Sequence, residues 1–129
     1  MKVNGIHHIA ISVKNLDRSI EFYKEIFGFV QAQRFERRDL NGKAVFLKLK
    51  GVQIEIWEFR DVKEPKDDLS DLKVRGLRHV ALSVTNLDEA YAELKSRVGI
   101  SEPRLGASGR RYSFLNDPDG IPIELYEQN

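Results

Sequence analysis

One segment of this sequence occurs twice. Residues 5–29 read GIHHIAISVKNLDRSIEFYKEIFGF and residues 76–100 read GLRHVALSVTNLDEAYAELKSRVGI, so the two align without a gap. They share glycines at both ends, an Asn-Leu-Asp motif in the middle and one histidine, which is His8 in the first copy and His79 in the second. Self-similarity at a fixed spacing predicts two copies of one supersecondary unit.

The later parts of the two copies also match. Residues 41–58 parallel residues 108–127, with a turn that is two residues longer in the second copy. Between the copies, residues 60–75 are dense in charge and contain one proline, which is typical of a solvated linker. We therefore predict a single domain, with module one at 1–59, the linker at 60–75 and module two at 76–129.

The residue pattern of copy one predicts a helix that follows a strand. Asn15 or Asp17 can cap this helix, an apolar stripe runs along it, and Gly28 is a suitable left-handed stop. Alternation and turn residues predict strands at 6–13, 30–37, 44–50 and 52–59. Copy one is thus predicted to be a βαβββ module.

Copy two repeats this order. Its helical stripe runs from Leu87 to Val98 and is followed by Gly99, which is expected to end the helix. Its second strand, near 101–106, is weakly signalled. The predicted fold class is α+β, with two tandem βαβββ modules.

Two histidines and two glutamates fall on the strand faces that the helices leave free. Successive strand side chains point to opposite faces, so the large aliphatic residues of each first strand face the helix, and His8 and His79 share the other face with alanine and serine. The same rule places Glu55 and Glu124, in the last strand of each copy, on that face. We expect a pseudo-two-fold axis between the copies to bring the four residues together.

This set of donors suits a metal ion. Two imidazoles and two carboxylates favour one divalent metal per site, namely Zn, Ni, Co, Mn or Fe, and the pattern does not choose among them. A six-coordinate ion with four protein ligands keeps two positions for substrate oxygens and acts as a Lewis acid. A structural histidine and a solvent-facing glutamate are the alternatives. His7 is excluded as a ligand, because it is expected on the helix side of the strand and copy two has Arg78 in its place.

Four further residues are candidates for substrate binding. Phe46 and Trp57 are expected to line the concave face beside the apolar part of a substrate, or else to form dimer contacts. Arg110 and Arg111 follow a Gly-Ala-Ser-Gly segment, which is either a mobile loop that grips a carboxylate or a flexible hairpin.

Composition excludes several classes of protein. The absence of cysteine excludes disulfides, thiolate metal sites and cysteine nucleophiles. The formal charge of +1 gives no basic surface for nucleic acid and no polybasic membrane tether. Neither a targeting segment nor an apolar run of about 18 residues is visible, so we expect a cytoplasmic protein with no contact with membranes.

The motifs HHIAISVKNLDRSIEFYKEIFGF, GLRHVALSV and FLNDPDGIPIELYEQ resemble the vicinal oxygen chelate superfamily, which includes glyoxalase I, methylmalonyl-CoA epimerase, extradiol dioxygenases and the bleomycin- and fosfomycin-resistance proteins. The resemblance covers essentially the whole chain and is strongest to uncharacterised bacterial glyoxalase I-like proteins. It implies a curved mixed sheet around a metal site whose ligands match His8, Glu55, His79 and Glu124.

The complete ligand set looks most like glyoxalase I. This implies a lyase or isomerase that acts through a metal-bound enediolate on a 2-oxoaldehyde–thiol adduct, with Glu124 as the catalytic base and Glu55 as the second candidate. The alternatives are an epimerase of an acyl-CoA or similar α-acidic substrate, which residues 102–111 resemble, and a non-catalytic small-molecule (antibiotic-type) binding protein. We predict a homodimer, whose site lies either within one chain or across the dimer interface.

Overall fold

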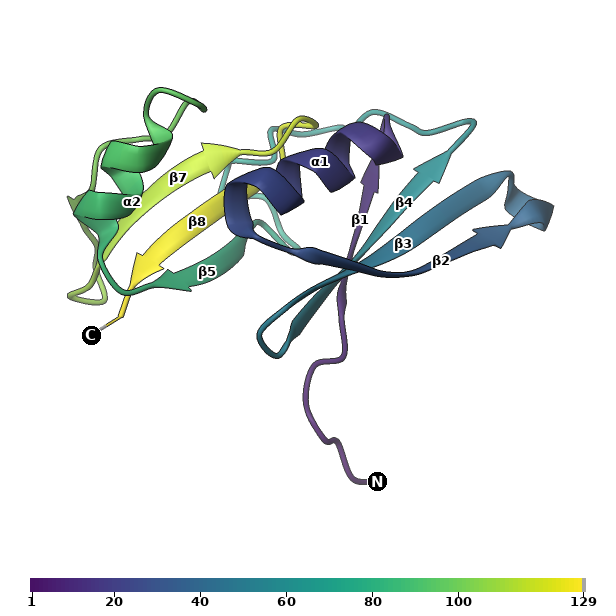
Figure 1. The fold of residues 1–129 in the computed structure, drawn as a ribbon, viewed down its shortest axis with the longest axis horizontal. Coiled ribbons are helices and arrows are strands. Elements are labelled where there is room, and N and C mark those ends of the chain that lie inside the picture. The colour runs from purple at the N-terminus through teal and green to yellow at the C-terminus, as the bar shows by residue number, and fades with distance from the viewer. Residues whose placement is uncertain (129) are drawn as a thin grey trace. The chain divides into compact units, whose positions relative to one another are not determined.

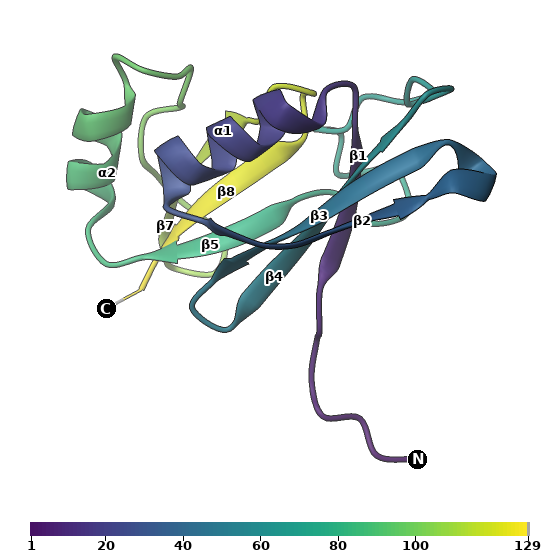
Figure 2. The ribbon, with the colours of Figure 1, turned by 45° about the vertical axis from the view of Figure 1, so that its right-hand side comes forward.

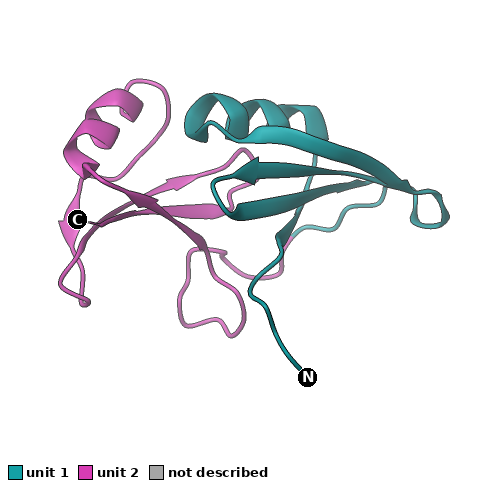
Figure 3. Ribbon diagram, turned by 60° about the horizontal axis from the view of Figure 1, so that its bottom comes forward, with its two compact units in different colours: residues 1–64 teal, residues 65–129 magenta. Residues whose placement is uncertain are grey.

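The computed structural model describes residues 1–128 and divides the chain into two compact units, Met1–Glu64 and Pro65–Asn129 (Figure 3). Each unit contains one four-stranded mixed sheet and one α-helix (Figures 1 and 2). The predicted α+β fold with two tandem βαβββ modules is therefore confirmed. Among residues 1–128, no helix has the length and apolar character needed to cross a membrane.

Unit 1 follows the predicted order of elements. These are β1 (Ile9–Val13), α1 (Leu16–Phe27), β2 (Val30–Arg37), the short 3-10 helix η1 (Arg38–Leu40), β3 (Gly42–Leu49) and β4 (Val52–Phe59). The strand order in the sheet is β1-β4-β3-β2. Strand β1 pairs with β4 in parallel, and the other neighbours are antiparallel.

Unit 2 repeats this topology. Its elements are β5 (Val80–Val84), α2 (Leu87–Leu94), β6 (Arg104–Leu105), β7 (Arg111–Asn116) and β8 (Pro122–Glu127), and the strand order is β5-β8-β7-β6. The weakly signalled second strand is present but only two residues long.

Two side-chain acceptors fix the start of each helix. The side chain of Asn15 accepts a hydrogen bond from the Arg18 N–H at 2.9 Å, so Asn15 and not Asp17 is the cap. Glu58, at the end of β4, accepts the Leu16 N–H at 2.6 Å. These bonds satisfy backbone donors that have no partner inside the helix.

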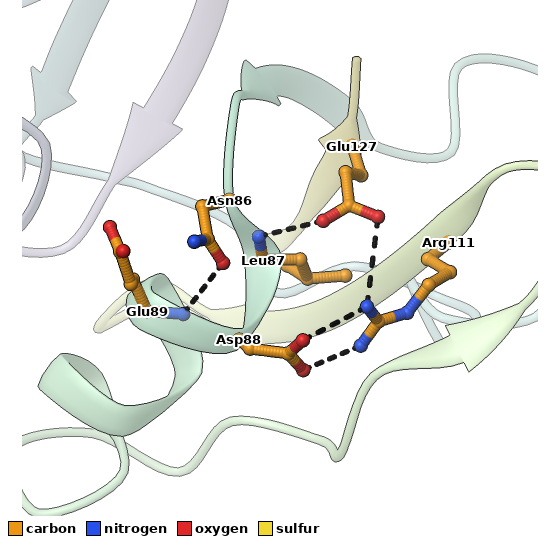
Figure 4. Close-up of polar contacts among 6 residues, drawn as sticks. All are labelled: Asn86, Leu87, Asp88, Glu89, Arg111 and Glu127. Atoms are coloured by element: carbon orange, nitrogen blue, oxygen red, sulfur yellow. Dashed lines mark hydrogen bonds and ion pairs between the residues drawn. The ribbon is translucent and has the colours of Figure 1, made fainter. Parts of the chain in front are cut away.

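The same arrangement recurs in unit 2, where Figure 4 shows it. Asn86 accepts the Glu89 N–H at 3.1 Å, and Glu127 accepts the Leu87 N–H at 2.9 Å. Both units therefore attach the start of the helix to the last strand of the sheet.

The two helices end differently. Gly28 ends α1 in the left-handed conformation, at φ 78°, as predicted. The prediction that α2 reaches Val98 is wrong, because α2 ends at Leu94 and Gly99 has no positive φ. The carbonyl of Leu94 accepts the N–H groups of both Arg97 and Val98, which closes a tight turn where another helical turn was expected.

The first strand of each unit is shorter than predicted. Strand β1 begins at Ile9, and residues 1–8 are exposed. Gly5 and Gly76 have φ values of 133° and 125°, which interrupt the extended chain at equivalent places before β1 and β5. His8 and His79 therefore lie immediately before their strands.

Each sheet buries its aliphatic face beneath its helix. In unit 1 the fully buried residues include Val13, Leu16, Tyr23, Val45, Leu47, Ile54 and Ile56. In unit 2 they include Leu87, Leu115, Ile123 and Leu125. The opposite faces carry small exposed residues in the first strands, namely Ala10, Ser12, Ala81 and Ser83. This side of each sheet carries the predicted site residues.

Candidate functional site

Unit 1 contains one histidine–glutamate pair on this face. Ala10 of β1 lies in register with Glu55 of β4, and His8 precedes β1. The distance from His8 Nε2 to Glu55 Oε2 is 3.8 Å. The glutamate side chain is 14% exposed, so it is largely shielded from solvent. The ring of Phe46 meets the His8 ring edge-on and closes one side of the pair.

The position of His7 differs from the prediction. His7 was expected on the helix side of a strand, but it lies before β1, and its Nδ1 is 2.9 Å from the Nδ1 of His8. One of these nitrogens donates a hydrogen bond to the other. This bond occupies Nδ1 of His8 and leaves Nε2 directed at Glu55, so His7 contacts the pair from the side away from the carboxylate.

Unit 2 contains the equivalent pair. Ala81 lies in register with Glu124, as Ala10 does with Glu55. The distance from His79 Nε2 to Glu124 Oε2 is 2.9 Å. Phe114 lies in register with Glu124 and packs edge-on against the His79 ring, as Phe46 does in unit 1.

Both pairs are compatible with binding a metal ion. Ligand atoms bound at about 2.0–2.2 Å and at right angles to each other lie about 3 Å apart. The His79–Glu124 distance matches this value, and the His8–Glu55 distance is longer by less than 1 Å. Among residues 1–128, the structure has no group of three or more His, Cys, Asp or Glu side chains that could hold one ion. The four predicted ligands therefore form two pairs, one in each unit.

The two glutamates have different neighbours. The indole N–H of Trp57 donates a hydrogen bond to Glu55 Oε1, while Oε2 of the same carboxylate faces His8. In unit 2, Tyr126 occupies the place equivalent to Trp57, because each lies in register with the serine of its first strand. Its hydroxyl bonds to the Ser108 hydroxyl at 2.7 Å and not to Glu124.

A cavity of about 260 Å³ lies beside His79 within unit 2. Its walls are mainly apolar, and its lining residues are Leu69, Ser70, Leu72, His79, Phe114, Asn116 and Pro122. The sequence predicted a solvated linker at 60–75. Residues 60–68 are exposed, but Leu69 is half-buried and belongs to the cavity wall.

Local hydrogen bonds order this part of the linker. The carboxylate of Asp68 accepts both the backbone N–H and the hydroxyl of Ser70, and these bonds lower the pKa of Asp68. Asp71 accepts the Lys73 N–H, and its backbone carbonyl accepts a bond from Arg78. The sequence signal for this wall is the pair of apolar residues, Leu69 and Leu72, within a charged segment.

The four predicted substrate-binding residues have different surroundings. Phe46 and Trp57 both pack against Phe35, on the face that carries Glu55. Arg110 is exposed, and its carbonyl accepts the Gly106 N–H in the turn before β7.

Arg111 belongs to a structural network at the start of α2 (Figure 4). It donates two hydrogen bonds to Asp88, and its Nη1 lies 3.8 Å from Glu127. The Arg111 guanidinium lowers the pKa of the Asp88 carboxyl, chiefly through these hydrogen bonds. Asp88 and Glu127 thus hold the guanidinium at the start of α2. This arrangement does not support the prediction that Arg111 binds substrate.

Comparison with known proteins gives a consistent result. The chain is 36% identical over 131 residues to the uncharacterised protein YwkD of Bacillus subtilis, and the alignment covers 99% of this chain and 100% of that protein. It is 37% identical over 126 residues to the uncharacterised protein YaeR of Escherichia coli, with 95% of both chains covered. The crystal structure of a glyoxalase family protein from Enterococcus faecalis has a TM-score of 0.83 and 31% identity, and it covers 96% of this chain and 98% of that one.

More distant relatives have named activities. Methylmalonyl-CoA epimerase of Dictyostelium discoideum is 26% identical, covering 98% of this chain and 80% of that protein. The trypanothione-dependent glyoxalase I of Leishmania major has a TM-score of 0.73 and 29% identity, covering 97% of this chain and 87% of that one. The sequence model of the glyoxalase/bleomycin resistance protein/dioxygenase superfamily matches residues 5–125. The chain belongs to this superfamily.

Proposed function

We propose that the protein is a metal-dependent lyase or isomerase of the glyoxalase I type, which isomerises the adduct of a 2-oxoaldehyde and a thiol. The observation that carries the proposal is the His–Glu pair, which recurs at equivalent register positions in both sheets. Relatives named lactoylglutathione lyase and glyoxalase I support the same reaction.

In this proposal the two pairs supply four ligands, His8, Glu55, His79 and Glu124, to one divalent ion. The set of two imidazoles and two carboxylates suits Zn, Ni, Co, Mn or Fe. When bound, the ion supplies Lewis-acid chemistry, which makes a C–H bond beside a carbonyl more acidic. The homodimer and the cytoplasmic location belong to the same proposal.

Glu124 is the proposed base, which moves a proton between two adjacent carbons of the substrate. A base must change its hydrogen bonds during turnover, and a carboxylate fixed by a neighbour is poorly suited to do so. Among residues 1–128, the polar contact of the Glu124 carboxylate is His79 at 2.9 Å, and His79 is itself a proposed ligand of the ion. Glu55 accepts the indole N–H of Trp57, which is not a proposed ligand and would keep holding the carboxylate when the ion is bound. The apolar cavity beside His79 is the proposed place for the substituent of the oxoaldehyde.

Epimerisation of an acyl-CoA or similar α-acidic substrate is the second candidate. Four mitochondrial methylmalonyl-CoA epimerases are 26–28% identical to this chain and cover 93–98% of it. Both reactions need a carboxylate that removes a proton beside a carbonyl, so the His–Glu pairs serve either. A small-molecule (antibiotic-type) binding protein without catalysis is the third candidate.

Metal stoichiometry tests the proposal first. Protein purified without a histidine tag is expected to hold one divalent metal per chain, and His79→Ala and Glu124→Ala are expected to lose it. Glu93→Ala, on the exposed surface of α2, is the matched control and is expected to keep it. Two ions per chain would show that each pair binds its own metal, and an absence of metal after reconstitution would refute the proposal.

Turnover then separates the reactions. An enzyme of the glyoxalase I type is expected to convert the methylglyoxal–glutathione adduct into a thioester. Solvent deuterium exchange at an acyl α-carbon without such turnover would favour the epimerase, and stoichiometric binding without either would favour the binding protein. Sedimentation tests the dimer, because a monomer with one metal per chain would exclude a site shared between two chains.

A further inference from the structure

The candidate ligand carboxylates of the two units have different hydrogen-bond partners. On the site face of unit 1, the indole N–H of Trp57 points at Glu55 and bonds to the oxygen that does not face His8. One oxygen of the carboxylate thus accepts a hydrogen bond from the indole, while the other faces the imidazole at 3.8 Å, beyond hydrogen-bond distance.

The indole is itself fixed by its neighbours. The Trp57 ring stacks on Phe59 with an interplanar angle of 11°, and it meets Phe35 edge-on at 89°. Phe59 in turn packs over Gly42, so closely that a Cβ atom there would lie 2.5 Å from the phenyl ring. Close aromatic packing restricts the rotamers of all three rings, so the donor has a defined direction.

Unit 2 lacks this support. The residue equivalent to Phe59 is Gln128, which accepts a bond from the Ser83 hydroxyl at 2.8 Å, and the hydroxyl of Tyr126 is bonded to Ser108. Among residues 1–128, no side-chain donor other than His79 contacts the Glu124 carboxylate. The duplicated module therefore has one carboxylate that an indole N–H holds and one whose polar contact is its own histidine.

We propose that Trp57 is a positioning residue that fixes Glu55 as a permanent metal ligand, so that Glu124, whose polar contact is the proposed ligand His79, alone serves as the base. This inference rests on the proposed function. Outer hydrogen bonds orient metal ligands, and their loss typically weakens metal binding by about 10–100-fold. Glu55 and Glu124 occupy equivalent positions in the repeat, and the hydrogen bond from Trp57 would thus give them different roles.

The metal-free protein provides the first test. Trp57 is the only tryptophan, so the chain has a single indole N–H signal in a ¹⁵N-correlated NMR spectrum. Glu55→Ala removes the acceptor and is expected to shift this signal upfield and to speed its exchange with solvent. Glu124→Ala is the matched control and should leave it in place. An indole signal that does not respond to Glu55→Ala would overturn the inference without any reference to metal.

Zinc affinity provides the second test, measured by competition with a chromophoric chelator. Trp57→Phe keeps an aromatic ring but loses the donor, and it is expected to bind zinc about 10–100-fold more weakly. Tyr126→Phe removes the equivalent polar group of unit 2 and should bind zinc as the unchanged protein does.

Equal affinities in Trp57→Phe and the unchanged protein would refute the positioning role while leaving the metal site intact. A comparable loss in both variants, with lowered thermal midpoints, would show a general structural effect and would also refute it. Failure of the unchanged protein to bind zinc or any other divalent metal would refute the proposed function itself, so the two failures are distinguishable.

Discussion

Replacement of Ser113 by alanine should stabilise the protein. Ser113 lies in β7 and is completely buried, and its hydroxyl has no hydrogen-bond partner among residues 1–128. It is in register with Leu125, as Val45 of unit 1 is with Ile56. The first unit therefore places an aliphatic side chain where the second has an unpaired hydroxyl.

The magnitude follows from two opposing terms. A buried polar group without a partner costs about 1–3 kcal/mol, which Ser113→Ala recovers. The void left by one oxygen atom costs a few tenths of a kcal/mol, at about 24 cal/mol per Å³. We therefore expect the free energy of unfolding to rise by about 1 kcal/mol or more, which corresponds to an increase of about 3–6 °C in the melting temperature for a chain of this size.

Urea unfolding at constant m value measures this change. Ser19→Ala is the matched control, because Ser19 is equally buried but has a polar interaction, and its replacement should not stabilise the protein. If Ser113→Ala left stability unchanged or lowered it, the Ser113 hydroxyl would have a partner in solution, and the reasoning would be refuted.

Further predictions concern the helix termini. Glu127→Ala should destabilise unit 2 by about 1 kcal/mol in urea unfolding, because the Leu87 N–H loses its acceptor; no change would show that water replaces the carboxylate. Arg111→Gln should raise the pKa of Asp88 toward its ordinary value, as NMR titration of the carboxyl can measure. Because the folded pKa of Asp88 is lowered, its contribution to stability is present above the unfolded pKa and is lost as pH falls through the folded pKa, and this loss should be absent in Arg111→Gln. Gly28→Ala should cost about 1 kcal/mol, since φ is 78° with no atom near the new Cβ, and an unchanged melting temperature would contradict that.

The strand faces of the two candidate glutamate ligands could be predicted because they depend on local periodicity. Strand side chains alternate, so the burial of Ile54 and Ile56 places Glu55 on the opposite face whatever the rest of the chain does. The Asn caps are equally local, since Asn15 bonds to a backbone group three residues away. Such features follow from a few neighbouring residues.

Features that depend on distant partners could not be predicted. The composition of the linker predicts a solvated segment, yet Leu69 and Leu72 form a wall of the cavity beside His79. Arg111 follows a glycine-rich segment and suggests a ligand contact, but Asp88, on a helix 23 residues earlier, binds its guanidinium. Only the fold brings such groups together, and no local sequence pattern indicates these contacts.

Comparison of the two units separates what the fold requires from what a site can vary. Both copies keep an asparagine cap, a glutamate from the last strand on the first helical N–H, and one His–Glu pair. They differ at the residue that follows the candidate ligand carboxylate by two positions. In unit 1 this residue is Trp57, which stacks on Phe59, and in unit 2 it is Tyr126, whose hydroxyl is bonded to Ser108. A metal that needs four ligands accepts two identical pairs, but a reaction that needs one mobile base does not. The copies therefore differ in the neighbours of two carboxylates whose roles the proposed reaction would make unequal.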